Sequence, residues 1–160
     1  MLLDILTTGG TIDKVYFDAK SHFEVGEPQI VEILREANLV IEYRVIPLLR
    51  KDSLDLTDAD RQTIAQAVRE SPAARIVITH GTDTMIETAQ SLGHISGKTI
   101  VLTGAMQPAR FRFTDAVFNI ASAIMATQTL AEGVYIVMNG RVFDPGKTRK
   151  NRALNRFEDI

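Results

Sequence analysis

The chain has 160 residues, of which 45% are apolar and 24% are charged, and its formal net charge is −2. This composition is ordinary for a globular domain with a buried core, and the charge gives no overall attraction to nucleic acid or to an anionic membrane. The absence of cysteine excludes a disulfide framework, a cysteine-ligated metal and a cysteine nucleophile. The sequence contains no run of 18 apolar residues, so it predicts no membrane span. No basic segment precedes the first apolar run, as it would in a signal peptide, so we expect a cytoplasmic protein.

Apolar runs typical of strands alternate along the chain with amphipathic stretches typical of helices. In chain order, we first expect a strand over 2–6, a loop over 8–26, a helix from Pro28 through Ala37 and a strand over 39–46 that stops at Pro47. The next helix begins at a Thr57/Asp60 capping box and ends at Ser71-Pro72. We then expect strands over 75–79, 99–102 and 134–138, with helices over 85–92 and 115–125 between them. This alternation predicts an α/β fold, with a mostly parallel sheet and helices on both faces, in a single domain over residues 1–160.

Basic residues crowd into the last 20 residues, where the sequence has little periodicity. They are Arg141, Lys147, Arg149, Lys150, Arg152 and Arg156. A nucleic-acid-binding tail is one interpretation of this pattern. The chain has few aromatic residues and more acidic than basic ones, so we favour a solvated or subunit-facing segment and expect no nucleic-acid partner.

Two short stretches, residues 7–12 and 79–85, each follow an apolar strand and place a threonine just beyond a glycine: Gly10-Thr11 and Gly81-Thr82. Open α/β sheets bind ligands at this end of their strands, so two hydroxyl groups at one edge indicate acyl-transfer chemistry. Asp83 beside Thr82 predicts a Thr–Lys–Asp cluster if a lysine lies near it. The alternatives are ordinary turns, with Asp83 as a helix cap.

Four segments occur in a fixed order: T-G-G-T-I at 8–12, D-S-L-D-L at 52–56, H-G-T-D-T-M at 80–85 and T-G-A-M-Q-P at 103–108. Together they resemble the bacterial-type L-asparaginases of the type I/II amidohydrolase family. The resemblance covers the family's N-terminal domain, so we expect a short, single-domain asparaginase that lacks the family's smaller C-terminal domain.

The resemblance implies roles for individual residues. Those with catalytic roles are Thr11, which is acylated, and Thr82, Asp83 and Lys150, joined by Tyr16 as our own choice of base. Those that bind substrate are Gly10, Asp52, Ser53, Gly81, Thr82 and Asp83, with Asp83 on the amino group and Ser53 on the carboxylate. The chain departs from the family at Phe23, where the family's mobile loop carries a tyrosine, and at Leu54, where a polar residue is usual.

The resemblance therefore implies conversion of L-asparagine to L-aspartate and ammonia, with a small amino acid as substrate and no metal or organic cofactor. Because the family's site lies at a subunit contact, we expect a homo-oligomer, either a dimer or a tetramer. An amino-acid-binding module with little or no activity is the alternative. His80 adjoins the second glycine–threonine stretch, and we expect it to be packed or hydrogen-bonded as a structural residue. The three histidines lack the spacing of a metal site, so we expect none.

Overall fold

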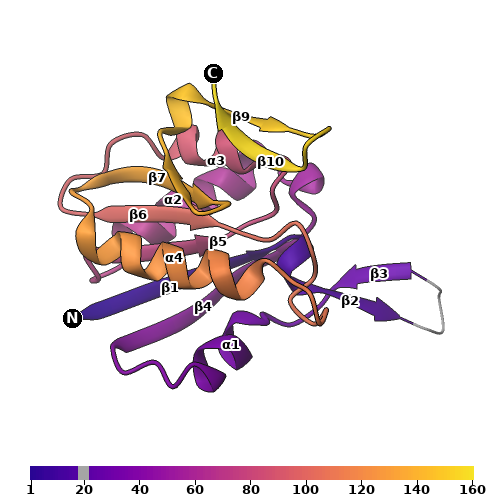
Figure 1. The fold of residues 1–160 in the computed structure, drawn as a ribbon. Helices are drawn as coiled ribbons and strands as arrows, with labels where there is room; N and C mark the ends of the chain where they lie inside the picture. The colour runs from indigo at the N-terminus through magenta and orange to yellow at the C-terminus, as the bar shows by residue number, and fades with distance from the viewer. Residues whose placement is uncertain (18–21) are drawn as a thin grey trace.

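A six-stranded sheet forms the centre of the computed structural model, which describes residues 1–17 and 22–160 (Figure 1). Its strands are β1 (Leu2–Gly9), β4 (Glu42–Lys51), β5 (Arg75–Thr79), β6 (Thr99–Thr103), β7 (Gly133–Met138) and β8 (Arg141–Phe143), in the order β4-β1-β5-β6-β7-β8. All neighbouring pairs are parallel except β7 with β8. The predicted α/β class and mainly parallel sheet are confirmed.

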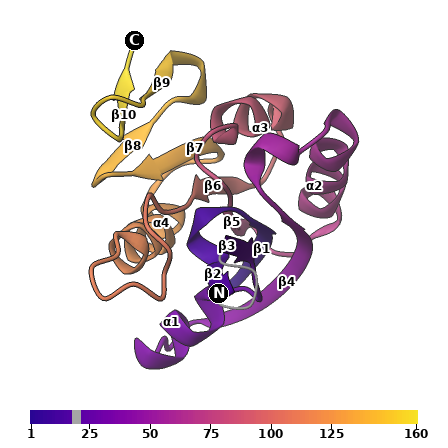
Figure 2. The ribbon, with the colours of Figure 1, turned by 90° about the vertical axis from the view of Figure 1, so that its right-hand side faces the viewer.

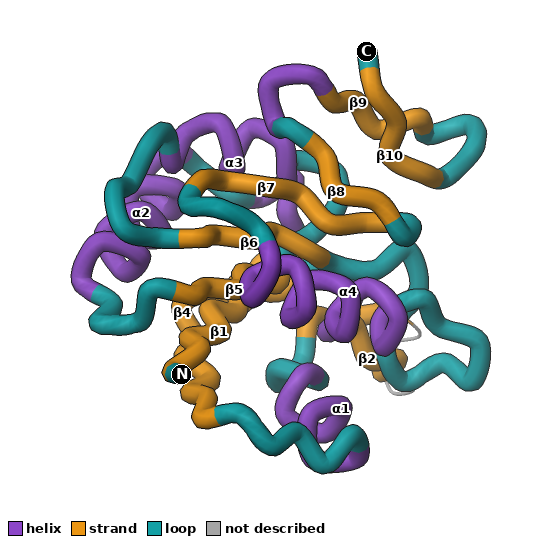
Figure 3. The backbone as a smooth tube through the Cα atoms, turned by 60° about the vertical axis from the view of Figure 1, so that its left-hand side comes forward, coloured by secondary structure: helices purple, strands orange, loops and turns teal. Residues whose placement is uncertain are grey.

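Helices cover both faces of this sheet (Figures 2 and 3). They are α1 (Ile30–Glu36), α2 (Asp58–Glu70), α3 (Met85–Leu92) and α4 (Ala116–Thr129). Successive side chains of a strand point to opposite faces, so Ile76 and Ile78 of β5 join the core beneath α2 and α3, whereas Val77 joins the core beneath α1 and α4. Burial on both faces explains why these strands are continuous apolar runs in the sequence.

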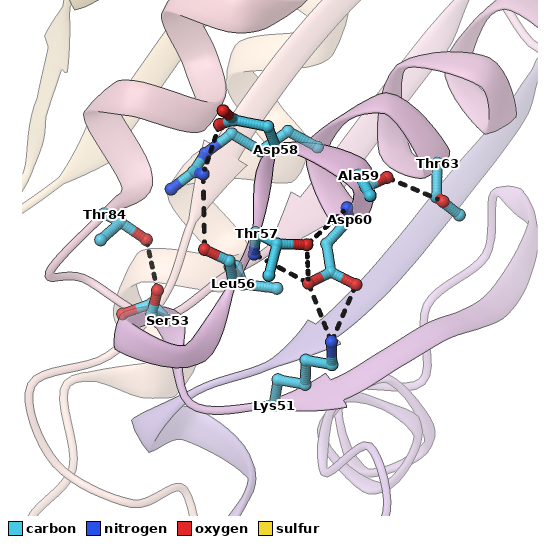
Figure 4. Close-up of polar contacts among 10 residues, drawn as sticks. Lys51, Ser53, Leu56, Thr57, Asp58, Ala59, Asp60, Thr63 and Thr84 are labelled. Atoms are coloured by element: carbon cyan, nitrogen blue, oxygen red, sulfur yellow. Dashed lines mark hydrogen bonds and ion pairs between the residues drawn. The ribbon is translucent and has the colours of Figure 1, made fainter.

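The N-terminus of α2 has the predicted capping box (Figure 4). The Asp60 N–H donates to Thr57 Oγ1 over 3.2 Å, and the Thr57 N–H donates to Asp60 Oδ2 over 2.8 Å. Lys51, the last residue of β4, also binds the Asp60 carboxylate, with Nζ 2.8 Å from Oδ2. The capping box therefore links the start of α2 to the end of the preceding strand.

The prediction of a loop over residues 8–26 is wrong. Strand β1 continues to Gly9, a 3₁₀ turn η1 (Thr11–Asp13) follows, and β2 (Lys14–Phe17) pairs with β3 (His22–Val25) as an antiparallel hairpin. Neither strand of this hairpin is covered by a helix, so the sequence shows no continuous apolar run there. The segment 18–21, which was part of the expected loop, lies outside the described residues.

Two other predicted boundaries are also wrong. Strand β4 passes through Pro47, because β4 is at the edge of the sheet, where a missing N–H donor is tolerated. Helix α1 begins at Ile30 and not at Pro28: Gln29 is its N-cap residue, and the N–H of Gln29 donates to Asp13 Oδ1 over 2.8 Å.

The basic C-terminal segment folds as a second antiparallel hairpin, made of β9 (Thr148–Asn151) and β10 (Arg156–Asp159), after a 3₁₀ turn η4 (Pro145–Lys147). Figure 1 shows it above the carboxyl ends of the central strands, with the β2–β3 hairpin projecting at the right. Within the described residues, no helix has the length and apolar character needed to cross a membrane.

Candidate active site

The order of the strands reverses at β1: the chain runs from β1 to β4 on one side of it and then continues with β5 on the other side. The crevice at the carboxyl ends of strands beside such a reversal is the usual ligand site of open α/β sheets. β1 and β5 are paired in register, with Thr7 opposite Thr79. The turns that carry Thr11 and Thr82 follow these two strands, so both begin at the switch point.

Two glycines bring these turns into contact. A Cβ atom on Gly10 would lie 2.4 Å from the Cα of Gly81, so the two backbones touch where no side chain fits. Gly10 also has a φ of 88°, which an L-residue with a side chain rarely adopts. Close packing therefore requires both glycines, and the backbone conformation is a second requirement at Gly10.

A third turn, η3 (Ser53–Asp55), packs against the second. A Cβ on Gly81 would lie 2.6 Å from Ser53 Oγ, and the hydroxyl of Thr84 donates to the Ser53 carbonyl oxygen over 2.7 Å (Figure 4). Asp52 caps this turn by accepting the Leu54 N–H over 3.2 Å. Ser53, Thr82 and their turns thus share one edge of the sheet, 29 positions apart in sequence.

Lys150 of β9 completes a cluster with the turn after β5. Its Nζ donates to Thr82 Oγ1 over 2.7 Å and to Asp83 Oδ1 over 2.9 Å, and its side chain is only 14% exposed. The structure therefore brings together the three members of the predicted Thr–Lys–Asp cluster. A lysine in its neutral form can take a proton from a threonine hydroxyl, and the adjacent carboxylate orients it. The catalytic roles of these residues remain predictions.

Thr11 is partly exposed at the start of η1, and Tyr16 lies five residues further on, in β2. The Tyr16 side chain is 53% exposed, and its ring packs edge-on against Phe23 with 5.3 Å between centroids. Phe23 in turn contacts Phe111. Within the described part of the chain, no hydrogen bond joins the Tyr16 hydroxyl to Thr11, and the role of Tyr16 as a base remains a prediction.

Two charged residues beside Thr11 were missed by the sequence reasoning. Lys14 forms an ion pair with Asp52, with 2.7 Å between Nζ and Oδ2, and so connects the Thr11 turn to the Ser53 turn. Burial alone would raise the pKa of Asp52, but the Lys14 ammonium and nearby backbone N–H groups outweigh it and hold the pKa below its usual range. Only the short distance of Lys14 from Thr11 in the sequence could have indicated this contact.

The second missed residue is Asp13, whose side chain is buried at the end of η1. Burial raises its pKa to about 7, although the N–H of Gln29 and the charge of Arg50 act in the opposite direction. Its backbone carbonyl oxygen also accepts the N–H of Gly26 over 2.8 Å, at the base of the β2–β3 hairpin. Asp13 therefore ties the Thr11 turn to Gly26 and Gln29, which follow the β2–β3 hairpin.

His80 has a structural arrangement, as expected. Its Nδ1 lies 2.7 Å from the Gly81 carbonyl oxygen, and its Nε2 lies 2.8 Å from the Thr88 hydroxyl. A carbonyl can only accept, so Nδ1 carries the proton and Nε2 accepts from Thr88. Burial lowers the pKa of His80 to about 4, and the imidazole is neutral. Within the described residues, no three histidine, aspartate or glutamate side chains group as they would around a metal ion.

Comparisons with known proteins agree on one family. The family model described as "Asparaginase, N-terminal" matches residues 3–158. L-asparaginase 2 of Escherichia coli is 32% identical over 153 residues, which cover 89% of this chain and 44% of that protein. A glutamyl-tRNA(Gln) amidotransferase chain of Methanococcus vannielii is 33% identical over 149 residues, which cover 89% of this chain and 35% of that protein.

Solved structures give the same result. The thermostable L-asparaginase from Thermococcus kodakarensis superposes with a TM-score of 0.85 and 29% identity, covering 100% of this chain and 51% of that chain. The chain thus spans about half of this structure, and less than half of the two curated relatives above.

Proposed function

The chain belongs to the asparaginase family, and on that premise we propose that it is an amidohydrolase that converts L-asparagine to L-aspartate and ammonia through an acyl-enzyme on Thr11. The observation that carries the proposal is the 2.7 Å hydrogen bond from Lys150 Nζ to Thr82 Oγ1, with Asp83 on the same ammonium group. This network lies in the turn that touches the Thr11 turn through Gly10 and Gly81.

In the first half of the reaction, the Thr11 hydroxyl attacks the side-chain amide carbon of asparagine. The oxygen–carbon bond forms, the carbon–nitrogen bond breaks, and the departing nitrogen takes a proton and leaves as ammonia. The threonine proton passes to a nearby base, for which Tyr16 is our candidate. The backbone N–H groups of Thr11 and Thr82 are our candidate donors to the developing oxyanion, since the N–H of Gly10 already donates to the Lys51 carbonyl oxygen over 2.9 Å. One such donor contributes about 3 to 4 kcal/mol to the transition state.

In the second half, water hydrolyses the β-aspartyl ester on Thr11. Thr82, hydrogen-bonded to Lys150, passes the proton of this water to the lysine as the new carbon–oxygen bond forms. The Thr11 oxygen is then protonated and L-aspartate is released. Asp83 holds the amino group of the substrate, and Ser53 with Asp52 and Gly81 forms the side of the site that receives its carboxylate. The reaction uses no metal or organic cofactor.

Two substitutions test this scheme. Thr11→Ala removes the nucleophile, and Thr82→Val keeps the shape of the side chain but removes the acceptor of the Lys150 bond. We expect each to lower ammonia release from asparagine by at least about 100-fold. Thr63→Ala is the matched control, because among the residues that the structure describes the Thr63 hydroxyl on α2 bonds only to its own helix, at the Ala59 carbonyl oxygen. Near-normal turnover in either site variant removes that residue from the mechanism.

The remaining predictions concern the setting of this activity. We propose that the protein works in the cytoplasm as a dimer or tetramer, with a free amino acid as its substrate. Sedimentation at micromolar and nanomolar concentrations tests the assembly, and full activity of a monomer contradicts it. The alternative, an amino-acid-binding module, is separated by calorimetry: binding of asparagine without ammonia release favours the module.

A further inference from the structure

Asp83 has a second cationic neighbour. Arg152, in the turn between β9 and β10, has its Nη2 3.4 Å from Asp83 Oδ1, the same oxygen that Lys150 binds at 2.9 Å. The two cations differ in burial, since the Lys150 side chain is 14% exposed and that of Arg152 is 72% exposed. Oδ2 of Asp83 has no hydrogen-bond partner among residues 1–17 and 22–160 and is left to receive a ligand.

Arg152 also differs from the other arginines of this region. Arg149 and Arg156 both pair with Glu158, and Arg141 pairs with Asp159. Within the described residues, the only acidic partner of Arg152 is Asp83. An exposed ion pair of this length contributes little to stability. A guanidinium has five N–H donors, so most of those on Arg152 stay available at the edge of the site.

The chemistry of the proposed substrate gives these donors a partner. An α-amino acid carries its ammonium and carboxylate groups on the same carbon atom. If Asp83 binds the ammonium group, the carboxylate lies within reach of a cation that already contacts Asp83. The Ser53 turn offers a hydroxyl and the apolar, 66% exposed Leu54 but no cation, and Lys14 is occupied by Asp52 at 2.7 Å.

We propose that Arg152 is a specificity-determining residue that binds the α-carboxylate of the amino-acid substrate, beside Asp83, which binds its ammonium group. The Ser53 hydroxyl is a further donor to the same carboxylate. This inference rests on the proposed function and deepens it: the substrate must have a free α-carboxylate as well as a free amino group. Arginine suits this task because its planar donors match a carboxylate, often in a two-bond arrangement.

The test compares Arg152→Gln with wild type on two substrates, L-asparagine and L-asparagine methyl ester, whose α-carboxylate is masked. We expect kcat/KM for asparagine to fall about ten-fold, mainly through KM, in line with the loss of one charge-assisted hydrogen bond at an exposed position. We expect the value for the ester to change less than two-fold, and Arg152→Lys to recover part of the loss. Arg149→Gln, in the same hairpin but paired with Glu158, should leave both substrates unchanged.

An equal loss on both substrates overturns the inference, because it means that Arg152 only supports Asp83 and Lys150. The same holds if Arg149→Gln reproduces the effect. If wild type releases no ammonia from asparagine, the proposed function fails, and Arg152 is then tested by calorimetric titration with L-aspartate and its α-methyl ester. A ten-fold loss of aspartate affinity in Arg152→Gln, with no change for the ester, supports the inference. Unchanged affinities, or no binding of aspartate to wild type, overturn it.

Discussion

Replacing Asp13 by asparagine should change how the stability of the protein depends on pH. Asp13 is 2% exposed, its Oδ1 accepts the Gln29 N–H over 2.8 Å, and burial raises its pKa to about 7 from 3.8. Arg50, which lines the same cavity of about 190 Å³, does not offset the burial. Asparagine has the same shape and keeps an oxygen for the Gln29 N–H, but it cannot ionise. The substitution therefore removes a buried group that must lose a proton as pH rises.

The sign and size follow from proton linkage. Between pH 3.8 and 7 the folded protein keeps the Asp13 proton while the unfolded chain has lost it, so this group's contribution to stability falls as pH rises. The full shift of about 3 units corresponds to about 4 kcal/mol, of which about 2 to 3 kcal/mol is lost between pH 5 and pH 8. His80 acts in the opposite direction. Its pKa is lowered to about 4, so its contribution falls by about 2 kcal/mol as pH drops from 8 to 5.

These opposing terms give a clear expectation for urea unfolding at pH 5, 6, 7 and 8. In wild type, the contributions of Asp13 and His80 nearly cancel from pH 5 to pH 8, so together they leave the free energy of unfolding almost unchanged. In Asp13→Asn only the His80 contribution remains, and the free energy of unfolding should rise by about 2 kcal/mol over the same range. The difference between the two proteins isolates Asp13. Asp55→Asn, an exposed carboxyl in η3, is the control and should follow wild type. Parallel curves for wild type and Asp13→Asn would refute the reasoning.

Three further substitutions separate the site from the fold. Gly81→Ala introduces a Cβ 2.6 Å from Ser53 Oγ, and the displaced turn should lower ammonia release by about 100-fold. The melting temperature of the same variant is measured as well, to show that the fold persists. Thr57→Ala removes the α2 cap and should lower the free energy of unfolding by about 1 kcal/mol with unchanged turnover. Phe157→Ala leaves a cavity under the C-terminal hairpin and should lower that free energy by about 3 to 5 kcal/mol, with an additional loss of kcat because Phe157 pairs with Lys150.

The sequence predicted the elements whose burial leaves a local pattern. Strands β5, β6 and β7 are apolar runs because helices cover both of their faces, and α2 begins at a capping box formed by residues three apart. Prediction from the sequence was wrong where the structure depends on how segments that are distant in the chain are arranged. Pro47 looks like the end of a strand, and only the edge position of β4 explains why the strand continues. The β2–β3 hairpin has no buried run to reveal it.

The residues of the candidate site also fall into two groups: those that a local sequence pattern indicates and those that only a distant contact brings into the site. Thr11 and Thr82 were found from local turns after strands, because parallel strands end at a common edge. Lys150 is 68 positions from Thr82, and no local pattern joins them; the resemblance to a family supplied that assignment. The Lys14–Asp52 ion pair spans 38 positions and was missed, since no motif relates the two residues.

Lys150 sits on an element that is not part of the central sheet, and this has a consequence for activity. The β9–β10 hairpin is fastened by Phe157, which is 3% exposed, packs near Phe143 and donates its N–H to Asn139 Oδ1 over 3.0 Å. Lys150 lies directly opposite Phe157 in the hairpin, so both side chains project from one face. Elements held by few buried contacts open at lower free energy than a core sheet. Conditions that loosen this hairpin should therefore remove the Lys150–Thr82 bond, and with it turnover, before the sheet that carries Thr11 unfolds.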